Sequence, residues 1–457
     1  MMRRAFGWLD DRVGTASFAR RALRKAFPDH WAFMLGEMAL YSFILLVATG
    51  VFLTFFFVAS GREVVYDGTY AALRGQEMSA AYESVLRVSF DVRAGMVMRQ
   101  THHWAALVFV AAIVLHLMRV FFTGAFRKPR DINWVLGGTL LLLGIGAGFT
   151  GYSLPDDLLS GTGLRIAYSV LLSIPFVGTW AAFLVFGGEF PTAEIISRLH
   201  VMHIMAFPAL IAAALAVHLG LVWHQKHSQF RGPGRTEDNV VGSPLWPNYT
   251  MKGAGVAFVV FGVLAGMGGL VQINPVWLYG PFDPSVVSSP AQPDWYLGWL
   301  EGALRLFPDW QIQAFEHTVS EVFWPGVVIP GLFFTIMFLW PWIERRITGD
   351  HGLHHLLDRP RDVPWRTGVG AAALAFTGIL TLAGSNDVLG EFFGVPVEAV
   401  TRVFRVLVVV LPPVVGYGTY RLMRELKERE IHPIRGHRTI TLRRTATGGF
   451  REEEEEE

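Results

Sequence analysis

Four histidines lie at matching positions within two long apolar stretches of the sequence. His102 and His116 are 14 positions apart in the first stretch, and His203 and His218 are 15 apart in the second. Fourteen helical residues span about 21 Å and about four turns, so both rings of one stretch point to nearly the same side at different depths. An unpaired polar ring costs free energy in hydrocarbon. The pattern therefore predicts two stacked His–His sites, each shared by the two stretches.

The composition places these stretches in a lipid bilayer. Hydrophobic residues make up 52% of the 457 residues and charged residues 17%, which is too apolar for a soluble protein. Eight apolar segments are long enough to cross roughly 30 Å of hydrocarbon. They are residues 31–59, 96–122, 132–154, 195–223, 253–273, 319–343, 369–385 and 403–420. We therefore predict an all-α integral membrane protein with eight transmembrane helices.

Two further segments are predicted to lie on the membrane surface. Residues 168–186 are apolar, but Pro175, Gly178 and Gly187 favour two short helices over one continuous span. The basic N-terminal segment, residues 1–29, indicates an interfacial helix because its apolar residues have helical spacing. These residues are Phe18, Ala22, Leu23, Ala26 and Phe27.

The loop charges predict how the chain is oriented. The loops on one side of the spans, together with both termini, hold 29 of the 39 Lys and Arg residues, whereas residues 274–320 on the other side hold only Arg305. The basic side is expected to be cytoplasmic, with both termini there. One span separates the two histidine helices, so they run parallel. His102 then pairs with His203 near the outer side, and His116 with His218 near the cytoplasm.

The two ends of the sequence carry little further information. We expect no cleavable signal peptide in the first thirty residues, because no short apolar core with a small-residue cleavage site is present. The terminal run of six glutamates is predicted to be disordered and without function.

The residues around the histidines favour haem over a bare metal ion. Two imidazoles on opposite faces of a porphyrin make a six-coordinate, electron-transferring haem. The sequence contains no cysteine, which excludes iron–sulfur ligation and covalent c-type attachment. Gly36 and Gly50, and likewise Gly137 and Gly151, repeat the 14-residue spacing on neighbouring spans and would let a flat macrocycle approach the backbone. The first four spans would then form a di-haem four-helix bundle.

Three arginines lie close to these histidines in the sequence. Arg99, Arg119 and Arg198 are each three to five residues from one of them, and guanidinium groups suit haem propionates. His103 and His200 are expected to be interface residues. Two other functions stay open at this point. One is a transporter that relays protons through histidines, and the other is a di-haem membrane anchor of a different oxidoreductase.

Several joined motifs resemble cytochrome b, the membrane core of the quinol:cytochrome c reductase (bc1) family. They are R-x-x-H at 99–102, H-x-x-R at 116–119, GYSLP at 151–155, SIPFVGT at 173–179 and PDWY at 293–296. The resemblance covers residues 36–420. It implies two non-covalent b haems and quinol oxidation near the outer side. One electron would go to a Rieske iron–sulfur partner, and the other through both haems to a quinone near the cytoplasm.

The PDWY motif is similar to the family's PEWY motif, with Asp in place of Glu. Oxidising a quinol releases protons, so its site needs a group that accepts them. Asp294 is the expected acceptor and Tyr296 is expected to shape the pocket, while Glu301 is a candidate second acceptor. The inner quinone site stays open between His224 and His227.

Other stretches resemble one branch of the family. The 15-residue spacing also occurs in the b6f branch, but no cysteine is available for the extra covalent haem of that branch. PDDLLSGTGLRI at 155–166 looks like the menaquinol-oxidising type of high-GC Gram-positive bacteria. This likeness implies menaquinone, a c-type cytochrome subunit, a terminal oxidase in a supercomplex and a homodimer, all in the cell membrane. No nucleic-acid partner is expected.

The predicted division of the chain follows from the spans and the motifs. Residues 1–30 form a cytoplasmic N-terminal region, 31–250 the di-haem domain with four spans, 251–425 the quinol-site domain with four spans, and 426–457 a cytoplasmic tail.

Overall fold

The computed structural model describes residues 7–455 except for residues 9, 13, 15, 17–18, 20–21, 193, 287–291, 315–316, 432–438 and 445–449. Within these residues, eight helices are long and apolar enough to cross a membrane, which confirms the predicted fold class. In chain order the spans contain α3 (Met34–Thr54), α5 (Gly95–Phe122), α6 (Asp131–Tyr152), α9 with α10 (Ile195–Val201 and Phe207–Gln225), α11 (Thr250–Leu270), α14 (Ile329–Thr348), α15 (Pro364–Ala383) and α17 (Val397–Ile431).

Short helical turns extend several of these spans. A 3-10 turn, Trp31–Phe33, precedes α3. π-helical turns, Leu245–Tyr249 and Trp324–Val328, precede α11 and α14. A third π-helical turn, Met202–Ala206, joins α9 to α10.

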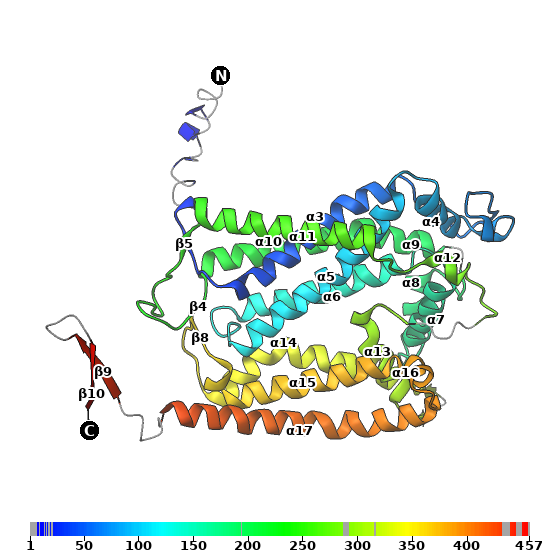
Figure 1. The fold of residues 1–457 in the computed structure, drawn as a ribbon. Helices are drawn as coiled ribbons and strands as arrows, with labels where there is room; N and C mark the ends of the chain where they lie inside the picture. The colour runs from blue at the N-terminus through cyan, green and yellow to red at the C-terminus, as the bar shows by residue number, and fades with distance from the viewer. Residues whose placement is uncertain are drawn as a thin grey trace.

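The eight spans form one bundle of roughly parallel helices (Figure 1). α3 packs along α5, α6 packs along α10, and α11 covers both α3 and α5. α14 lies against α6, while α15 and α17 run side by side along the lower edge in Figure 1. The largest apolar core lies between α5, α6 and α10. Its buried side chains include Phe109, Ile113, Leu140, Leu141 and Ile211.

Most short elements gather at one end of the bundle, on the right in Figure 1. They include α4 (Ala80–Phe90), α7 (Leu158–Leu172), α8 (Gly178–Phe186), α12 (Val276–Tyr279), α13 (Trp295–Leu306) and α16 (Asn386–Phe393). Two antiparallel hairpins also belong to the predicted outer loops. These are β2 (Glu63–Val65) with β3 (Glu77–Ser79), and β6 (Ile312–Ala314) with β7 (His317–Val319).

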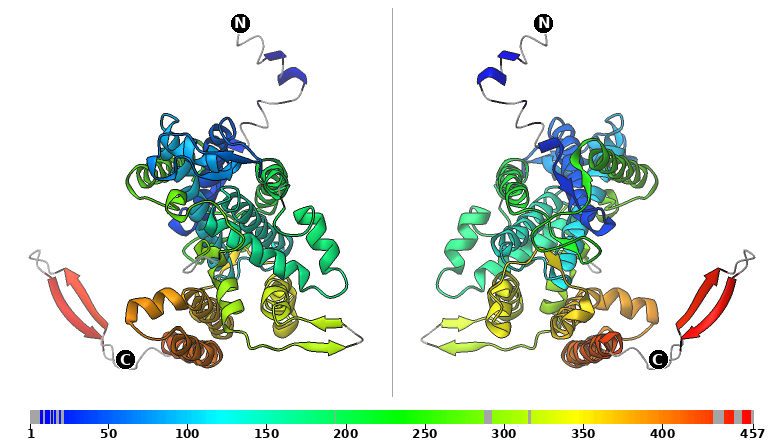
Figure 2. Two further views of the ribbon diagram at one scale, coloured as in Figure 1. Left: turned by 90° about the vertical axis from the view of Figure 1, so that its right-hand side faces the viewer. Right: turned by 90° about the vertical axis from the view of Figure 1, so that its left-hand side faces the viewer.

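The helices α7 and α8 confirm that residues 168–186 do not form one span. Ser173 ends α7, and α8 begins only at Gly178, after Pro175 has interrupted the helix. Gly187 then ends α8 with a φ of +85°, a left-handed conformation that glycine adopts without strain. Figure 2 shows the two helices projecting from the side of the bundle.

The opposite end of the bundle contains two small sheets. β1 (Ala26–Phe27) pairs antiparallel with β5 (Ser243–Pro244), and β4 (Gln229–Phe230) pairs parallel with β8 (Leu356–Leu357). The predicted interfacial helix is therefore wrong at Ala26 and Phe27, and Phe18 lies outside the described residues. The Phe27 ring packs against the rings of His227 and Tyr249, with centroids 4.3 and 4.6 Å away. This packing holds the segment against the protein in an extended conformation.

The predicted disorder of the glutamate tail is also wrong. β9 (Thr439–Arg444) and β10 (Phe450–Glu455) form an antiparallel hairpin that begins after α17. β-branched residues such as those in the sequence TIT at 439–441 favour strands, and a second strand is needed to pair their backbone groups. The last two glutamates lie outside the described residues.

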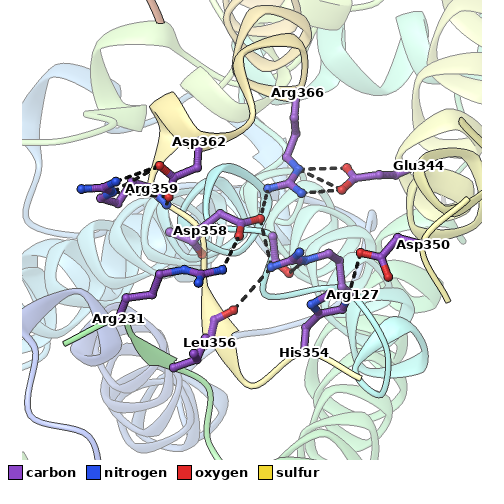
Figure 3. Close-up of polar contacts among 12 residues, drawn as sticks. Arg127, Arg231, Glu344, Asp350, His354, Leu356, Asp358, Arg359, Asp362 and Arg366 are labelled. Atoms are coloured by element: carbon purple, nitrogen blue, oxygen red, sulfur yellow. Dashed lines mark hydrogen bonds and ion pairs between the residues drawn. The ribbon is translucent and has the colours of Figure 1, made fainter. Parts of the chain in front are cut away.

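A buried ion-pair network joins several loops at the predicted cytoplasmic end (Figure 3). Arg366 at the start of α15 donates to both carboxylate oxygens of Glu344 on α14 and to Asp358 in the loop between these helices. Arg127, from the turn between α5 and α6, lies 2.9 Å from Asp358. Arg231, from the loop after α10, lies 3.8 Å from the same carboxylate. The network thus connects the first four spans to the last four.

Candidate functional site

The structure brings the four predicted histidines together as two pairs. The ring centroids of His102 and His203 are 6.0 Å apart, and those of His116 and His218 are 6.4 Å apart. The rings of each pair are nearly perpendicular, at 76° and 74°. The pairing and the two depths are those that the sequence pattern predicts.

A π-helical turn explains why the two spacings differ by one residue. His203 lies within the turn Met202–Ala206, whereas His102 and His116 lie in the continuous helix α5. A π turn accommodates one extra residue and is frequent at functional sites. The 15-residue spacing on the second helix therefore covers the same depth as the 14-residue spacing on α5, and both pairs meet.

The separation of the rings suits one metal ion between each pair. An imidazole nitrogen binds a transition metal at about 2.0–2.1 Å, so two rings on opposite sides of one ion have centroids roughly 6 Å apart. The observed separations of 6.0 and 6.4 Å match this distance. Two rings in direct hydrogen-bond or stacking contact would lie closer. The residues present therefore fit two bis-histidine sites.

Hydrogen bonds fix the tautomer of the outer pair. The Thr49 hydroxyl donates to Leu45 O at 2.7 Å, so it accepts from Nδ1–H of His102 at 2.9 Å. Nδ1–H of His203 donates to Ala147 O, also at 2.9 Å. A neutral ring that donates through Nδ1 keeps an unprotonated Nε2, which is the form that binds a metal. The tautomer of the inner pair is not fixed in this way, because Nδ1 of His116 is buried with no hydrogen-bond partner among the described residues.

The predicted glycines lie against the histidine rings. A Cβ atom on Gly151 would lie 2.4 Å from Cε1 of His203, and Cβ atoms on Gly36 and Gly50 would lie 3.2 Å from the rings of His116 and His102. A Cβ atom on Gly137 would lie farther from its histidine ring, at 4.0 Å from Cε1 of His218. The space beside Gly36, Gly50 and Gly151 is thus taken first by a histidine ring edge, whereas the atom nearest to the space beside Gly137 is Cδ2 of Leu117, at 3.4 Å. These glycines let the ring-bearing helices and their neighbours pack closely at each site.

Each histidine pair lines its own cavity. The outer cavity, of about 270 Å³, is lined by His102 and His203 together with Gly50, Gly151 and Arg99. The inner cavity, of about 420 Å³, is lined by His116 and His218 together with Gly36, Gly137 and Arg119. Both arginines therefore lie where a cofactor carboxylate would find a charge partner.

Arg198 lies apart from the other predicted cofactor residues. Its guanidinium donates to Leu184 O at 2.8 Å and is 3.6 Å from the Glu194 carboxylate, at the turn between α8 and α9. The side chain is 42% exposed. The structure therefore gives Arg198 a role in holding α8 against the start of α9, and leaves Arg99 as the arginine of the outer cavity.

The quinol motif contributes directly to the outer cavity. Asp294 and Tyr296 both line it. The Tyr296 hydroxyl donates to one carboxylate oxygen of Asp294 at 3.0 Å, and Nε2 of His103 lies 2.9 Å from the other. Burial raises the pKa of Tyr296, so this phenol stays protonated and acts as a donor. Asp294 is thereby held at the wall of the cavity that His102 and His203 also line.

Glu301 lies in a different environment from Asp294. It lines a separate outer cavity of about 530 Å³ that lies between α7, α13 and the start of α14. Nε of Arg305 donates to the Glu301 carboxylate at 2.8 Å, and the same guanidinium reaches Asp387 on α16 at 2.8 Å. The two predicted acceptors therefore face different cavities.

Sequence reasoning missed two basic residues of the inner cavity. Arg130 and Lys226 line it beside His116 and His218, together with His227, one of the two histidines between which the inner quinone site was left open. Burial, reinforced by the nearby positive charge of Lys25, lowers the pKa of His227 to about 4. His227 is therefore neutral at physiological pH. The signal that could have found Arg130 is the charged turn RKPRDINW, whose position beside the cavity only the fold reveals. His224 does not line this cavity with His227.

Comparisons with known proteins point to one family. Residues 107–281 match the family model described as "Cytochrome b(N-terminal)/b6/petB". The chain is 51% identical over 414 residues to the cytochrome bc1 complex cytochrome b subunit of Mycobacterium tuberculosis, covering 90% of this chain and 75% of that relative. It is 48% identical to the subunit of the same name from Streptomyces coelicolor, covering 98% and 82%.

A solved structure has a similar fold. The chain described as "Hyperthermophilic respiratory Complex III" superimposes with a TM-score of 0.67 over 91% of this chain and 99% of that chain. Only 20% of the residues are identical, so the likeness concerns the fold alone. The overall fold of this chain is therefore also found on a chain of very different sequence.

Proposed function

The chain belongs to the cytochrome b subunits of cytochrome bc1 complexes, and on this premise we propose that it oxidises a quinol near the outer face and carries electrons inward through two haems. Membership of the family makes the chain a haem-binding oxidoreductase subunit in a membrane. The observation that supports the more detailed proposal is the pair of bis-histidine sites. Both have the ring separation that one shared metal ion requires, at two depths of one bundle.

We assign the outer b haem to His102 and His203, and the inner b haem to His116 and His218. A haem with two imidazole ligands supplies one-electron transfer. The protein's part is to hold the rings and their tautomers. Thr49 and the Ala147 carbonyl keep the outer Nε2 atoms unprotonated. Arg99 and Arg119 would each pair with propionate carboxylates in their cavities.

Quinol oxidation to quinone releases two electrons and two protons. We propose that Asp294 accepts one proton, because its carboxylate lies in the outer cavity beside the histidine pair and is held by two donors. One electron would pass to an iron–sulfur partner and the other to the outer histidine site. Glu301 stays the candidate for the second proton. Its carboxylate lines the separate outer cavity and is held by Arg305 at 2.8 Å.

We expect Asp294→Asn to slow quinol oxidation roughly 100-fold while both haems stay bound. The amide keeps the shape of the side chain but cannot accept the proton. Quinol:cytochrome c reductase turnover of the purified complex and its reduced-minus-oxidised spectrum together measure this. Unchanged turnover would refute the role of Asp294. If no b-type band equal to two haems per chain is found in the native complex, the assignment of two bis-histidine haem sites fails.

We expect Gly151→Val to remove the outer haem and leave the inner one. The first added carbon would lie 2.4 Å from Cε1 of His203, closer than any real contact, so the ring must move. The haem content per chain, resolved by redox titration of the two b bands, measures the loss. Gly266→Ala on α11 is the matched control, because its Cβ would meet nothing within 4 Å. Retention of both haems in Gly151→Val would contradict the assignment.

The other partners are proposed from the family and the charge pattern. We propose a Rieske iron–sulfur subunit, a c-type cytochrome subunit, a homodimer and contact with a terminal oxidase. We propose menaquinol as the quinol and the plasma membrane as the location, with both termini in the cytoplasm. The loops at the end that carries the Arg366 network are the basic ones. The division into residues 31–250 and 251–425 is proposed in the same way.

A further inference from the structure

Three consecutive side chains of α5 contact three different parts of the protein. His102 faces His203, and the next residue, His103, reaches Asp294, 191 positions later in the sequence. Nε1–H of Trp104 then donates to Val271 O at the end of α11, at 2.9 Å. Successive helical residues point about 100° apart. The haem-binding helix therefore presents one side chain to the proposed outer site and another to the quinol motif.

The carboxylate of Asp294 has one donor for each oxygen. An ionised carboxylate only accepts hydrogen bonds, so Nε2 of His103 carries the hydrogen and donates to Oδ1 at 2.9 Å. The Tyr296 hydroxyl donates to Oδ2 at 3.0 Å. The side chains of His103 and Asp294 are only 13% and 14% exposed. Water competes little for these hydrogen bonds.

The helix α6 leaves room for the Tyr296 side chain that donates to Asp294. A Cβ atom on Gly148 of α6 would lie 2.4 Å from the Tyr296 hydroxyl, so only glycine lets the phenol reach its position. Tyr152 on α6 and Arg99 on α5 are further titratable groups that line the same cavity. Among the described residues that line this cavity, His103 is the one whose ring nitrogen lies within hydrogen-bond distance of Oδ1 of Asp294.

We propose that His103 is a positioning residue that holds the ionised Asp294 carboxylate facing the outer histidine site. This proposal rests on the proposed quinol oxidation. A hydrogen bond to a charged acceptor is stronger than one to a neutral acceptor. The hold is therefore tightest on the form of Asp294 that accepts a proton.

Two substitutions separate this role from simple packing. His103→Gln keeps an N–H donor close to the position of Nε2, whereas His103→Asn offers the same amide one methylene nearer the backbone, where it cannot reach Asp294. Both variants are polar and similar in size. Asp294→Asn serves as the reference for complete loss of the acceptor.

The experiment uses the full complex and three readouts. The reduced-minus-oxidised spectrum counts the b haems, and steady-state kinetics with a soluble menaquinol analogue give kcat and KM. Redox-difference infrared spectra report the carboxyl band of Asp294, identified by its disappearance in Asp294→Asn. We expect His103→Asn to keep both haems, to lower kcat roughly tenfold with little change in KM, and to shift the Asp294 band. His103→Gln should stay within about twofold of the native kcat and leave the band in place.

Two results would overturn the proposal. One is a native kcat and an unshifted band in His103→Asn. The other is equal loss in both variants, which would show that His103 acts through packing alone. A failure of the proposed function has a different signature, because the native complex itself would then lack quinol oxidation or the Asp294 band would not respond to redox change. If His103→Asn fails to bind haem, the band in His103→Gln decides the question.

Discussion

Replacing His218 by leucine is expected to remove the inner haem and to keep the outer one. His218 forms a pair with His116 alone, at 6.4 Å, and the outer pair lines a separate cavity. With one imidazole missing, the inner site has one nitrogen ligand and an apolar side chain opposite it, so it no longer fits a bis-histidine group. His116→Leu is expected to give the same result from the other helix.

The measurement is a redox titration of the b-type absorbance in the purified complex. The native complex should show two components, and each variant should keep only the outer one. His351→Leu is the matched control because that histidine is exposed in the loop between α14 and α15, and both components should remain. Two surviving components in His218→Leu would show that the pairing is wrong. Loss of both from a correctly assembled complex would show that the two sites do not form independently.

The histidine pairs could be predicted because they depend on periodicity and burial. A helix has a fixed rise, so a 14-residue spacing in an apolar stretch fixes two depths and one face. Hydrocarbon tolerates such rings only if they find a common partner. The number of spans followed from the same physics, as did the rejection of a span at residues 168–186. These features depend on local sequence and on the bilayer thickness.

Contacts between distant segments could not be predicted in the same way. His103 was expected only to be an interface residue, and its contact with Asp294 depends on how α13 is placed against α5. Arg198 resembled a cofactor residue by its distance from His203 along the chain, yet it bonds to the end of α8. A π turn moves His203 by one residue relative to a regular helix, and no simple sequence rule predicts such a turn.

The N-terminal segment was predicted wrongly for a related reason. Its apolar spacing is compatible with an amphipathic helix, but the Phe27 ring packs against His227 in the loop after α10 and against Tyr249 in the π-helical turn before α11. Pairing of β1 with β5 also satisfies backbone groups that a surface helix would satisfy internally. Tertiary contacts thus override a local preference that is weak over so short a segment.

The buried network in Figure 3 is the second place where one substitution should have a large effect. The side chains of Arg366 and Glu344 are 2% and 4% exposed. Burying charges is costly, so a buried ion pair adds little stability by itself, but removing one partner leaves an uncompensated charge. In Arg366→Leu, Asp358 keeps Arg127 at 2.9 Å, whereas Glu344 keeps, among the described side chains, only the indole N–H of Trp340 at 3.2 Å. Most of the destabilisation is therefore expected to come from the uncompensated charge of Glu344.

Arg366→Leu is expected to lower the free energy of unfolding by about 3–5 kcal/mol. The double variant Arg366→Leu with Glu344→Leu should recover more than half of this, because it removes the stranded charge together with its partner. Thermal unfolding of the solubilised complex, followed by tryptophan fluorescence, compares the two. Arg424→Leu is the control for an exposed pair. Its partner Glu428 is 56% exposed, and such pairs contribute less than about 1 kcal/mol.

The double variant also tests what the network does for the inner site. The Arg366 guanidinium lies 5.5 Å from the ring of Phe126, which lines the inner cavity. If the network only balances charge, the double variant should recover stability and keep a native inner haem potential. If it also holds the wall of the cavity, stability should return while the inner potential stays shifted. A single variant as stable as the native protein would show that Glu344 takes up a proton or water instead of staying charged and buried.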